Sequence, residues 1–109
     1  MPVSGATLLD ETGPSRVDRV GPLCARLRSV ASTLKGLETA RLDSLELAVS
    51  EAATNAVIHA HGSDPARPLR LVVRTERHGA GPRLVVEVHD HGPGLDSRRL
   101  AAQAPDELV

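Results

Sequence analysis

Three polar side chains of different chemistry recur one helical turn apart near the middle of the chain: Glu51, Asn55 and His59. Residues four positions apart lie on one face of an α-helix, so this spacing predicts a row containing an acid, an amide and an imidazole. An amide oxygen is a hard, neutral ligand suited to Mg²⁺, and a glutamate one turn earlier could take a proton from a water or a hydroxyl. Taken alone, Glu51 and Asn55 are more typical of a solvated helix face.

The helix that must carry this row is predicted at about residues 37–60. Its opposite side has an apolar stripe whose members recur every three or four residues. The stripe consists of Leu42, Leu45, Val49, Ala53, Ala56 and Ala60. Beyond the helix, Gly62 suits a left-handed cap, and Pro65 and Pro68 prevent continuation. One side of this helix therefore joins a core, and the other is available for chemistry.

A second motif, Asp90-x-Gly92-x-Gly94, follows a predicted strand. The two glycines allow backbone conformations closed to other residues and let a ligand approach the main chain closely. An aspartate facing a mostly apolar pocket at this point can accept a hydrogen bond from an exocyclic amine such as that of adenine. A plain turn built from Asp, Gly and Pro explains the motif equally well.

The N-terminal part of the chain predicts a strand followed by a helix. Residues 6–9 form a short apolar patch typical of an edge strand, and residues 11–15 have turn chemistry. Apolar residues then recur three and four apart over residues 17–34, which predicts an amphipathic helix. Because Pro22 lacks an amide hydrogen, this helix either begins there or is kinked there.

The C-terminal half predicts a hairpin. Apolar and polar residues alternate over residues 69–74 and 84–89, on either side of a turn at residues 79–82, and an antiparallel pair is the simplest outcome. Asp96 is expected to cap a final short helix at residues 97–103. Helices grouped beside such strands predict an α+β two-layer sandwich, with the helices packed on one face of a mainly antiparallel sheet.

Composition limits the kinds of protein that this chain can be. Its 109 residues predict a single domain, residues 1–109. Phe, Tyr and Trp are absent, so the core must consist of Leu, Val and Ala, and aromatic stacking on a base is excluded. The net charge is −1 and the basic residues are scattered, which argues against direct nucleic-acid binding. A solvated strand face accounts for the nearest cluster, Arg67, Arg70 and Arg74.

The single cysteine, Cys24, excludes an internal disulfide and is typical of a reducing compartment. It falls on an apolar helix face, so buried packing is expected. No stretch approaches the roughly 20 apolar residues of a membrane span. The N-terminus also lacks the charged-then-apolar pattern of a signal peptide. These features predict a soluble cytoplasmic protein without a membrane partner.

Four histidines occur as two alternating pairs, His59 with His61 and His89 with His91. Imidazole binds zinc, copper and nickel, so a transition-metal site is one reading. Histidines two positions apart point in different directions on a helix, however, and no cysteine or second acid completes a tetrahedral set. Surface or pocket-rim histidines are therefore favoured over a ligand cluster.

Together the two motifs resemble the GHKL-type nucleotide-binding fold shared by gyrase, Hsp90, histidine kinases and MutL, also called the Bergerat-type ATP-binding fold. The helix motif of this family reads Glu-Ala-x-x-Asn-Ala-x-x-His, as here from Glu51 to His59, and the glycine motif reads Asp-x-Gly-x-Gly, as here from Asp90 to Gly94. The resemblance spans roughly residues 15–100, and it is closest to the anti-sigma-factor serine kinases.

This resemblance implies a site that binds ATP and Mg²⁺. Asn55 would coordinate the Mg²⁺ that bridges the phosphates, Glu51 would be the general base, and Asp90 would bind the adenine amine. The other positions carried over from the family belong to the pocket floor and the phosphate region. They are Gly92 and Gly94 for the floor and His59 near the phosphates.

In the kinases of this group, a serine on a small antagonist protein is phosphorylated, and the protein also captures a sigma factor. Phosphoryl transfer is mostly positioning and charge neutralisation, so it requires little covalent chemistry from the protein. Family members usually continue into a lid loop and a second glycine-rich motif, so the resemblance implies a C-terminally short chain. An exposed sheet edge would then favour a partner or a homodimer. The alternative is a catalytically inactive interaction module that keeps the fold and binds a regulatory partner independently of nucleotide.

Overall fold

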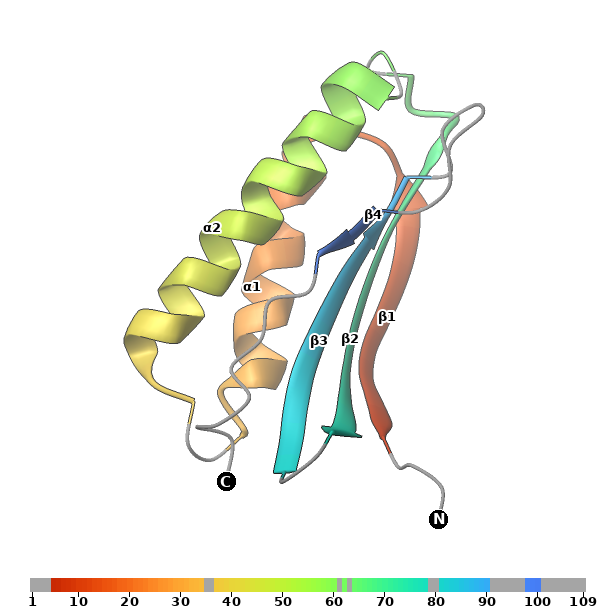
Figure 1. The fold of residues 1–109 in the computed structure, drawn as a ribbon. Coiled ribbons are helices and arrows are strands. Elements are labelled where there is room, and N and C mark those ends of the chain that lie inside the picture. The colour runs from red at the N-terminus through yellow and green to blue at the C-terminus, as the bar shows by residue number, and fades with distance from the viewer. Residues whose placement is uncertain are drawn as a thin grey trace.

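The structure of this chain is a computed structural model that describes residues 5–34, 37–60, 62, 64–78, 81–90 and 98–100. Two helices, α1 (Val20–Ala31) and α2 (Thr39–Asn55), cover one face of an antiparallel sheet (Figure 1). The predicted α+β sandwich with its helices on one face is therefore confirmed. No helix in the described part of the chain is long and apolar enough to cross a lipid bilayer.

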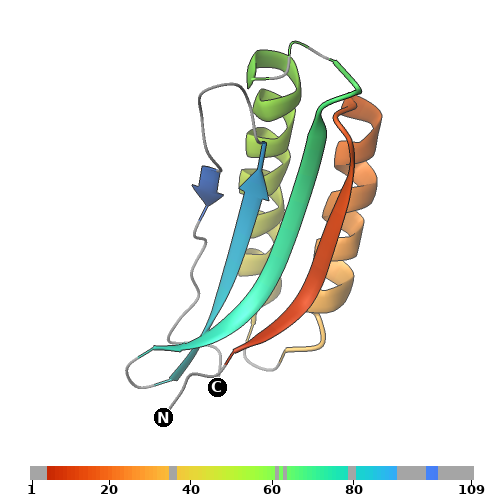
Figure 2. The same ribbon diagram turned by 90° about the vertical axis from the view of Figure 1, so that its right-hand side faces the viewer.

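The sheet has the order β1-β2-β3-β4, and every neighbouring pair is antiparallel. Its strands are β1 (Ala6–Pro14), β2 (Pro68–His78), β3 (Gly81–His89) and β4 (Arg98–Leu100). Figure 2 shows the three long strands in front of the two helices, with β4 beside the end of β3. The hairpin predicted from the alternating residues is thus the pair β2 and β3.

Strand β1 is longer than predicted, because residues 11–14 of the turn expected at residues 11–15 pair with β2 instead. The strand continues to Pro14, which lies opposite Pro68 on β2. Backbone pairing along β2 outweighs the local turn preference, and proline is tolerated at the end of an edge strand. The chain turns at Ser15, whose amide donates a hydrogen bond to the carbonyl oxygen of Arg67 at 3.0 Å.

Two C-terminal expectations are also corrected. Gly81 and Pro82, expected in the hairpin turn, belong to β3 and lie opposite His78 and Arg77. The helix expected at residues 97–103 is wrong where the structure describes it, since Arg98–Leu100 is a strand opposite Val86 to Val88 of β3. Pairing with β3 satisfies backbone groups that would otherwise lie at an open edge, and this outweighs a weak local helix preference.

Helix α1 accommodates its proline without a break. A 3₁₀ turn at Val17–Arg19 precedes α1, and Pro22 is the third residue of α1 itself. The first amide groups of a helix have no intrahelical acceptor, so a proline in the first turn costs no hydrogen bond. The sequence left two alternatives at Pro22, and the structure places it inside the first turn.

Helix α2 ends in a π-helical turn that the sequence did not predict. Regular α-helix stops at Asn55, and residues Ala56–Ala60 continue as a π-helix, so the helical region ends at the predicted residue. Gly62 follows with a φ of 58°, which is the predicted left-handed conformation. The π turn therefore begins directly after the residue expected to bind Mg²⁺.

The hydrophobic core lies between the helices and the sheet and is entirely aliphatic, apart from Cys24. Leucines and valines that alternate along β2 and β3 meet the apolar faces of α1 and α2, as the periodicity predicts. The largest fully buried members are Leu23, Leu27, Val49, Val57, Leu69, Leu71, Val73, Leu84, Val86 and Val88. Cys24 is 4% exposed, which confirms its predicted burial.

The outer face of the sheet carries a network of ion pairs. Arg70 binds Asp10 across β1 and β2, with Nη2 and Oδ2 separated by 2.8 Å. Glu87 accepts a hydrogen bond from Arg74 at 2.9 Å and contacts Nε2 of His89 at 3.0 Å. Arg70 and Arg74 thus lie on the predicted solvent-side face of β2 and form ion pairs there.

This network predicts an acid-sensitive contribution to stability. Burial raises the pKa of Glu87, but its hydrogen bonds with Arg74 and His89 outweigh burial and hold the pKa below its ordinary value of 4.5. The folded state therefore binds its proton less readily than the unfolded state, so the stabilisation is present above pH 4.5 and is lost as the pH falls. The free energy of unfolding, measured with urea, is expected to decline less steeply between about pH 5 and pH 3 in Glu87→Gln than in the unsubstituted chain. Identical slopes would contradict this assignment.

Candidate functional site

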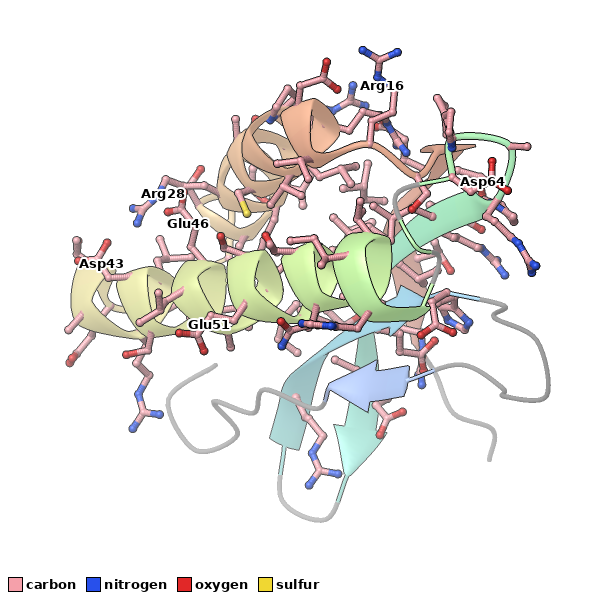
Figure 3. The ribbon with its side chains drawn as sticks, turned by 90° about the horizontal axis from the view of Figure 1, so that it is seen from above. Arg16, Arg28, Asp43, Glu46, Glu51 and Asp64 are labelled. Carbon is pink, nitrogen blue, oxygen red and sulfur yellow. The ribbon has the colours of Figure 1, made fainter. Side chains whose placement is uncertain are left out.

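The polar row of the central helix lies at the molecular surface. Glu51 and Asn55 lie on α2 and His59 lies on the π turn, and all three are exposed. Figure 3 shows Glu51 on the flank of α2 that faces away from α1. The apolar stripe on the opposite side of α2 is buried in the core from Leu42 to Ala56, so the predicted division of this helix is confirmed over those residues.

The π turn changes how His59 relates to Asn55. In a regular α-helix these residues would lie one above the other, but a π turn contains an extra residue and so redirects the side chains that follow it. Such turns occur frequently at functional sites. The row expected from a 3.6-residue period therefore holds for Glu51 and Asn55 and is interrupted before His59.

A hollow of about 400 Å³ opens on the outer side of α2 beside this pair. It is lined by Ser50, Glu51, Thr54 and Asn55, and it is open to solvent. Its lining offers one carboxylate, one amide and two hydroxyls, which suits a polar ligand or a hydrated cation better than an apolar one. The structure thus brings Glu51 and Asn55 together in one hollow.

Asp90 occupies a different environment. It follows β3 directly and continues the alternation of Leu84, Val86 and Val88, whose side chains face the helices. It is only 1% exposed, which is rare for a carboxylate. A carboxylate has two oxygens that can each accept hydrogen bonds, so a buried one at this position can recognise a donor group on a ligand.

The two parts of the site lie toward the same end of the molecule. Helix α2 and strand β3 pack against each other and run toward the same end, so Asn55 and Asp90 both lie near their C-terminal ends (Figure 1). Gly92 and Gly94, predicted to shape the pocket floor, lie outside the described residues. The fold therefore places a surface amide and a buried carboxylate on neighbouring elements.

Three hydroxyl residues were missed by the sequence reasoning. Ser50 and Thr54 line the hollow one position before Glu51 and Asn55, so a second polar pair at the same four-residue spacing could have revealed them. Ser15 is 1% exposed at the end of β1. No pattern marks Ser15, because its burial depends on contacts between segments far apart in sequence.

The residues present fit a nucleotide carried with Mg²⁺. Among the described residues, no group of three or more His, Cys, Asp or Glu side chains could hold a metal ion. A cation at Asn55 would therefore take most of its ligands from phosphate oxygens and water, which is how Mg²⁺ is bound at many nucleotide sites. The buried carboxylate of Asp90 is, in turn, a suitable acceptor for an exocyclic amine.

Comparison with models of protein families places most of the chain in a known domain family. The sequence model of the histidine kinase-like ATPase domain matches residues 13–107. No curated protein and no solved structure matches the chain. The matched region contains α1, α2 and all of β2, β3 and β4, together with both sequence motifs. The chain therefore belongs to the histidine kinase-like ATPase domain family.

Proposed function

We propose that this chain is a cytoplasmic ATP-binding regulatory protein of the anti-sigma-factor type, with protein-serine kinase activity toward an antagonist protein. The observation that carries the proposal is the pairing of two different polar environments on neighbouring elements. Glu51 and Asn55 share an open polar hollow on α2, and Asp90 is buried at the end of β3. Membership of the ATPase domain family supports ATP as the ligand that bridges them.

Each residue has a distinct part in this proposal. The Asn55 amide oxygen would hold Mg²⁺ beside the phosphates, and Asp90 would accept a hydrogen bond from the adenine amine. Glu51 would accept the proton of the serine hydroxyl on the partner. His59, exposed on the π turn, would lie toward the phosphates. Bound Mg²⁺-ATP would supply the transferable phosphoryl group, and Gly92 and Gly94 remain the proposed pocket floor.

The exposed position of Glu51 supports its part as a base for a protein substrate. A hydroxyl on another protein can reach only a residue at the surface, and Glu51 lies on an exposed flank of α2 (Figure 3). Asn55 lies one turn away in the same hollow, so a cation held there would be close to the same reacting groups. This arrangement favours positioning and charge neutralisation as the main catalytic means.

Substitution of Asn55 tests the metal-dependent part of the proposal. Calorimetric titration of ATP into Asn55→Ala, with and without Mg²⁺, should show affinity about tenfold below that of the unsubstituted chain when Mg²⁺ is present. Without Mg²⁺ the two proteins should bind ATP alike, because the lost interaction is with the cation. Ser50→Ala, which alters the same hollow, is the matched control. Equal Mg²⁺-dependent affinities for Asn55→Ala and the unsubstituted chain would contradict the proposal.

A second candidate function is an interaction module that binds a regulatory partner independently of nucleotide. The observation in its favour is that Leu47 and Ile58 of the α2 region are 60% and 43% exposed. Capture of a sigma factor or an antagonist would then persist when ATP is removed, whereas the kinase proposal requires ATP for modification of the antagonist. Sedimentation with and without ATP would also distinguish a homodimer from a monomer.

A further inference from the structure

Two hollows on the helical layer meet at Ser50 and form one continuous surface. The first is a groove of about 370 Å³ between α1 and α2, and the second is the polar hollow that contains Glu51 and Asn55. Ser50 lines both. The remaining groove residues are Val20, Gly21, Cys24, Asp43, Glu46 and Leu47. A chain bound in the groove could therefore cross α2 and reach the candidate catalytic residues.

The groove offers a place for an aliphatic side chain. Its floor includes Val20 and Cys24, which are 6% and 4% exposed, and its rim includes Leu47, which is 60% exposed. Ile58, eleven residues after Leu47 and 43% exposed, lies beyond the polar hollow on the same helical region. An exposed leucine beside a buried apolar floor gains from being covered, because burial removes its apolar surface from water.

The groove also carries an excess of negative charge. Arg28 of α1 forms ion pairs with both Asp43 and Glu46 of α2, and the Glu46 contact measures 2.9 Å. One guanidinium group cannot neutralise two carboxylates, and the Asp43 side chain stays 64% exposed. Figure 3 shows Arg28 and Glu46 where the helices face each other, whereas Glu51 lies on the other flank. A basic side chain on a partner would complement this charge.

Helix geometry sets the spacing of the two contacts. Leu47 and Glu51 are one turn apart, a rise of about 6 Å along the axis. An extended chain advances about 3.3 Å per residue, so about two residues span this distance. An aliphatic residue seated against Leu47 therefore places a residue two positions away level with Glu51 along the axis of α2.

We propose that this surface docks an extended segment of the protein substrate. The segment carries an aliphatic residue for the groove, a lysine or arginine for Asp43, and a serine two positions from the aliphatic residue, over Glu51. This inference rests on the proposed function, which supplies the need for a serine. It adds the sequence pattern that selects the serine and the surface of the protein that recognises this pattern.

Short synthetic peptides test the docking rule on the full chain. In one set of peptides a leucine lies two positions from a serine, and lysines lie on the far side of the leucine. This pattern is synthesised in both chain directions. Control peptides replace the leucine by aspartate or the lysines by glutamate. Fluorescence anisotropy should show binding about tenfold weaker to Leu47→Asp and about threefold weaker to Asp43→Asn. Val17→Asp, at a residue that is 52% exposed and does not line the groove, should bind within about twofold of the unsubstituted chain.

Several results would overturn the docking surface. One is that no leucine-lysine peptide shows saturable binding. Another is that Leu47→Asp binds the peptides as tightly as the unsubstituted chain does. A third is that Leu47→Asp and Val17→Asp lose the same amount of peptide affinity. A dimer that dissociates on Leu47→Asp substitution would also overturn it, because the occupant would then be a second copy of the chain. ATP titration separates this inference from the proposed function, since Leu47→Asp should keep the unsubstituted affinity for ATP. A chain that binds the peptides as predicted but not ATP would overturn the proposed function and support the docking surface.

Discussion

Replacement of Asp90 by asparagine is expected to weaken ATP binding by about 10- to 100-fold, because it removes a charged acceptor from the proposed adenine contact. The substitution keeps the size of the side chain, and Asp90 is 1% exposed, so little else about the pocket wall changes. Calorimetric titration with Mg²⁺-ATP measures the effect directly, and thermal unfolding of the variant establishes that the fold is retained.

A change of nucleotide makes this test specific for the amine. Inosine triphosphate carries a carbonyl where ATP carries the exocyclic amine, so its 6-position accepts a hydrogen bond and cannot donate one to Asp90. The Asp90→Asn variant should bind inosine triphosphate at least as well as the unsubstituted chain does, because the amide can donate where the carboxylate cannot. Titrating both nucleotides into both proteins gives the coupling free energy between residue 90 and the base. This coupling separates the contact from any general effect of the substitution on the pocket.

The control for this prediction is an aspartate at the surface. Asp18 is paired with Arg16 at 2.8 Å, and its side chain is 66% exposed. Asp18→Asn should leave ATP affinity unchanged, since exposed ion pairs contribute little and this one lies in the turn before α1. If Asp90→Asn bound ATP as tightly as Asp18→Asn does, the carboxylate would not contact the nucleotide.

The largest expected loss of stability follows from truncation of the core at Leu27. This residue of α1 is 1% exposed, and Leu27→Ala should lower the free energy of unfolding by about 2–5 kcal/mol. The core contains no aromatic side chain that could shift to fill the resulting cavity. Because a small domain has a net stability of only about 5–15 kcal/mol, the change should be obvious in urea unfolding.

Leu47→Ala is the matched control, because it removes the same atoms from the same residue type at a surface position. Leu47 is 60% exposed, so its truncation should change the free energy of unfolding by less than about 0.5 kcal/mol. A comparable loss in both variants would mean that α1 does not pack as the structure indicates. A small effect at Leu47 would also establish that its proposed contribution to docking is separate from folding.

Much of the fold could be predicted from residue periodicity. Leu42, Leu45 and Val49 recur at helical spacing, and Leu84, Val86 and Val88 alternate as a strand requires, so each local pattern identified its element and its buried face. The grouping of helices beside a hairpin then indicated the two-layer arrangement. These predictions succeeded because local conformation and burial favour the same structure at these positions.

The candidate site was only partly predictable. The four-residue spacing of Glu51 and Asn55 placed both on one exposed face, and their shared hollow agrees with that prediction. The π turn after Asn55 could not be read from the sequence, because Ala56 and its neighbours favour no helical form over another strongly enough. Ser15 likewise shows no local sign of its burial.

By itself the sequence determined the amphipathic helices, the hairpin, the aliphatic core and the two motifs of the candidate site. Tertiary structure alone decided the outcome wherever distant segments compete with local preference. Pairing with β2 extended β1 through residues typical of a turn, and pairing with β3 made Arg98–Leu100 a strand. The approach of α1 to α2 likewise created the groove beside Leu47. The physical reason is that backbone pairing and the burial of side chains depend on neighbours far along the chain, which local propensity does not encode.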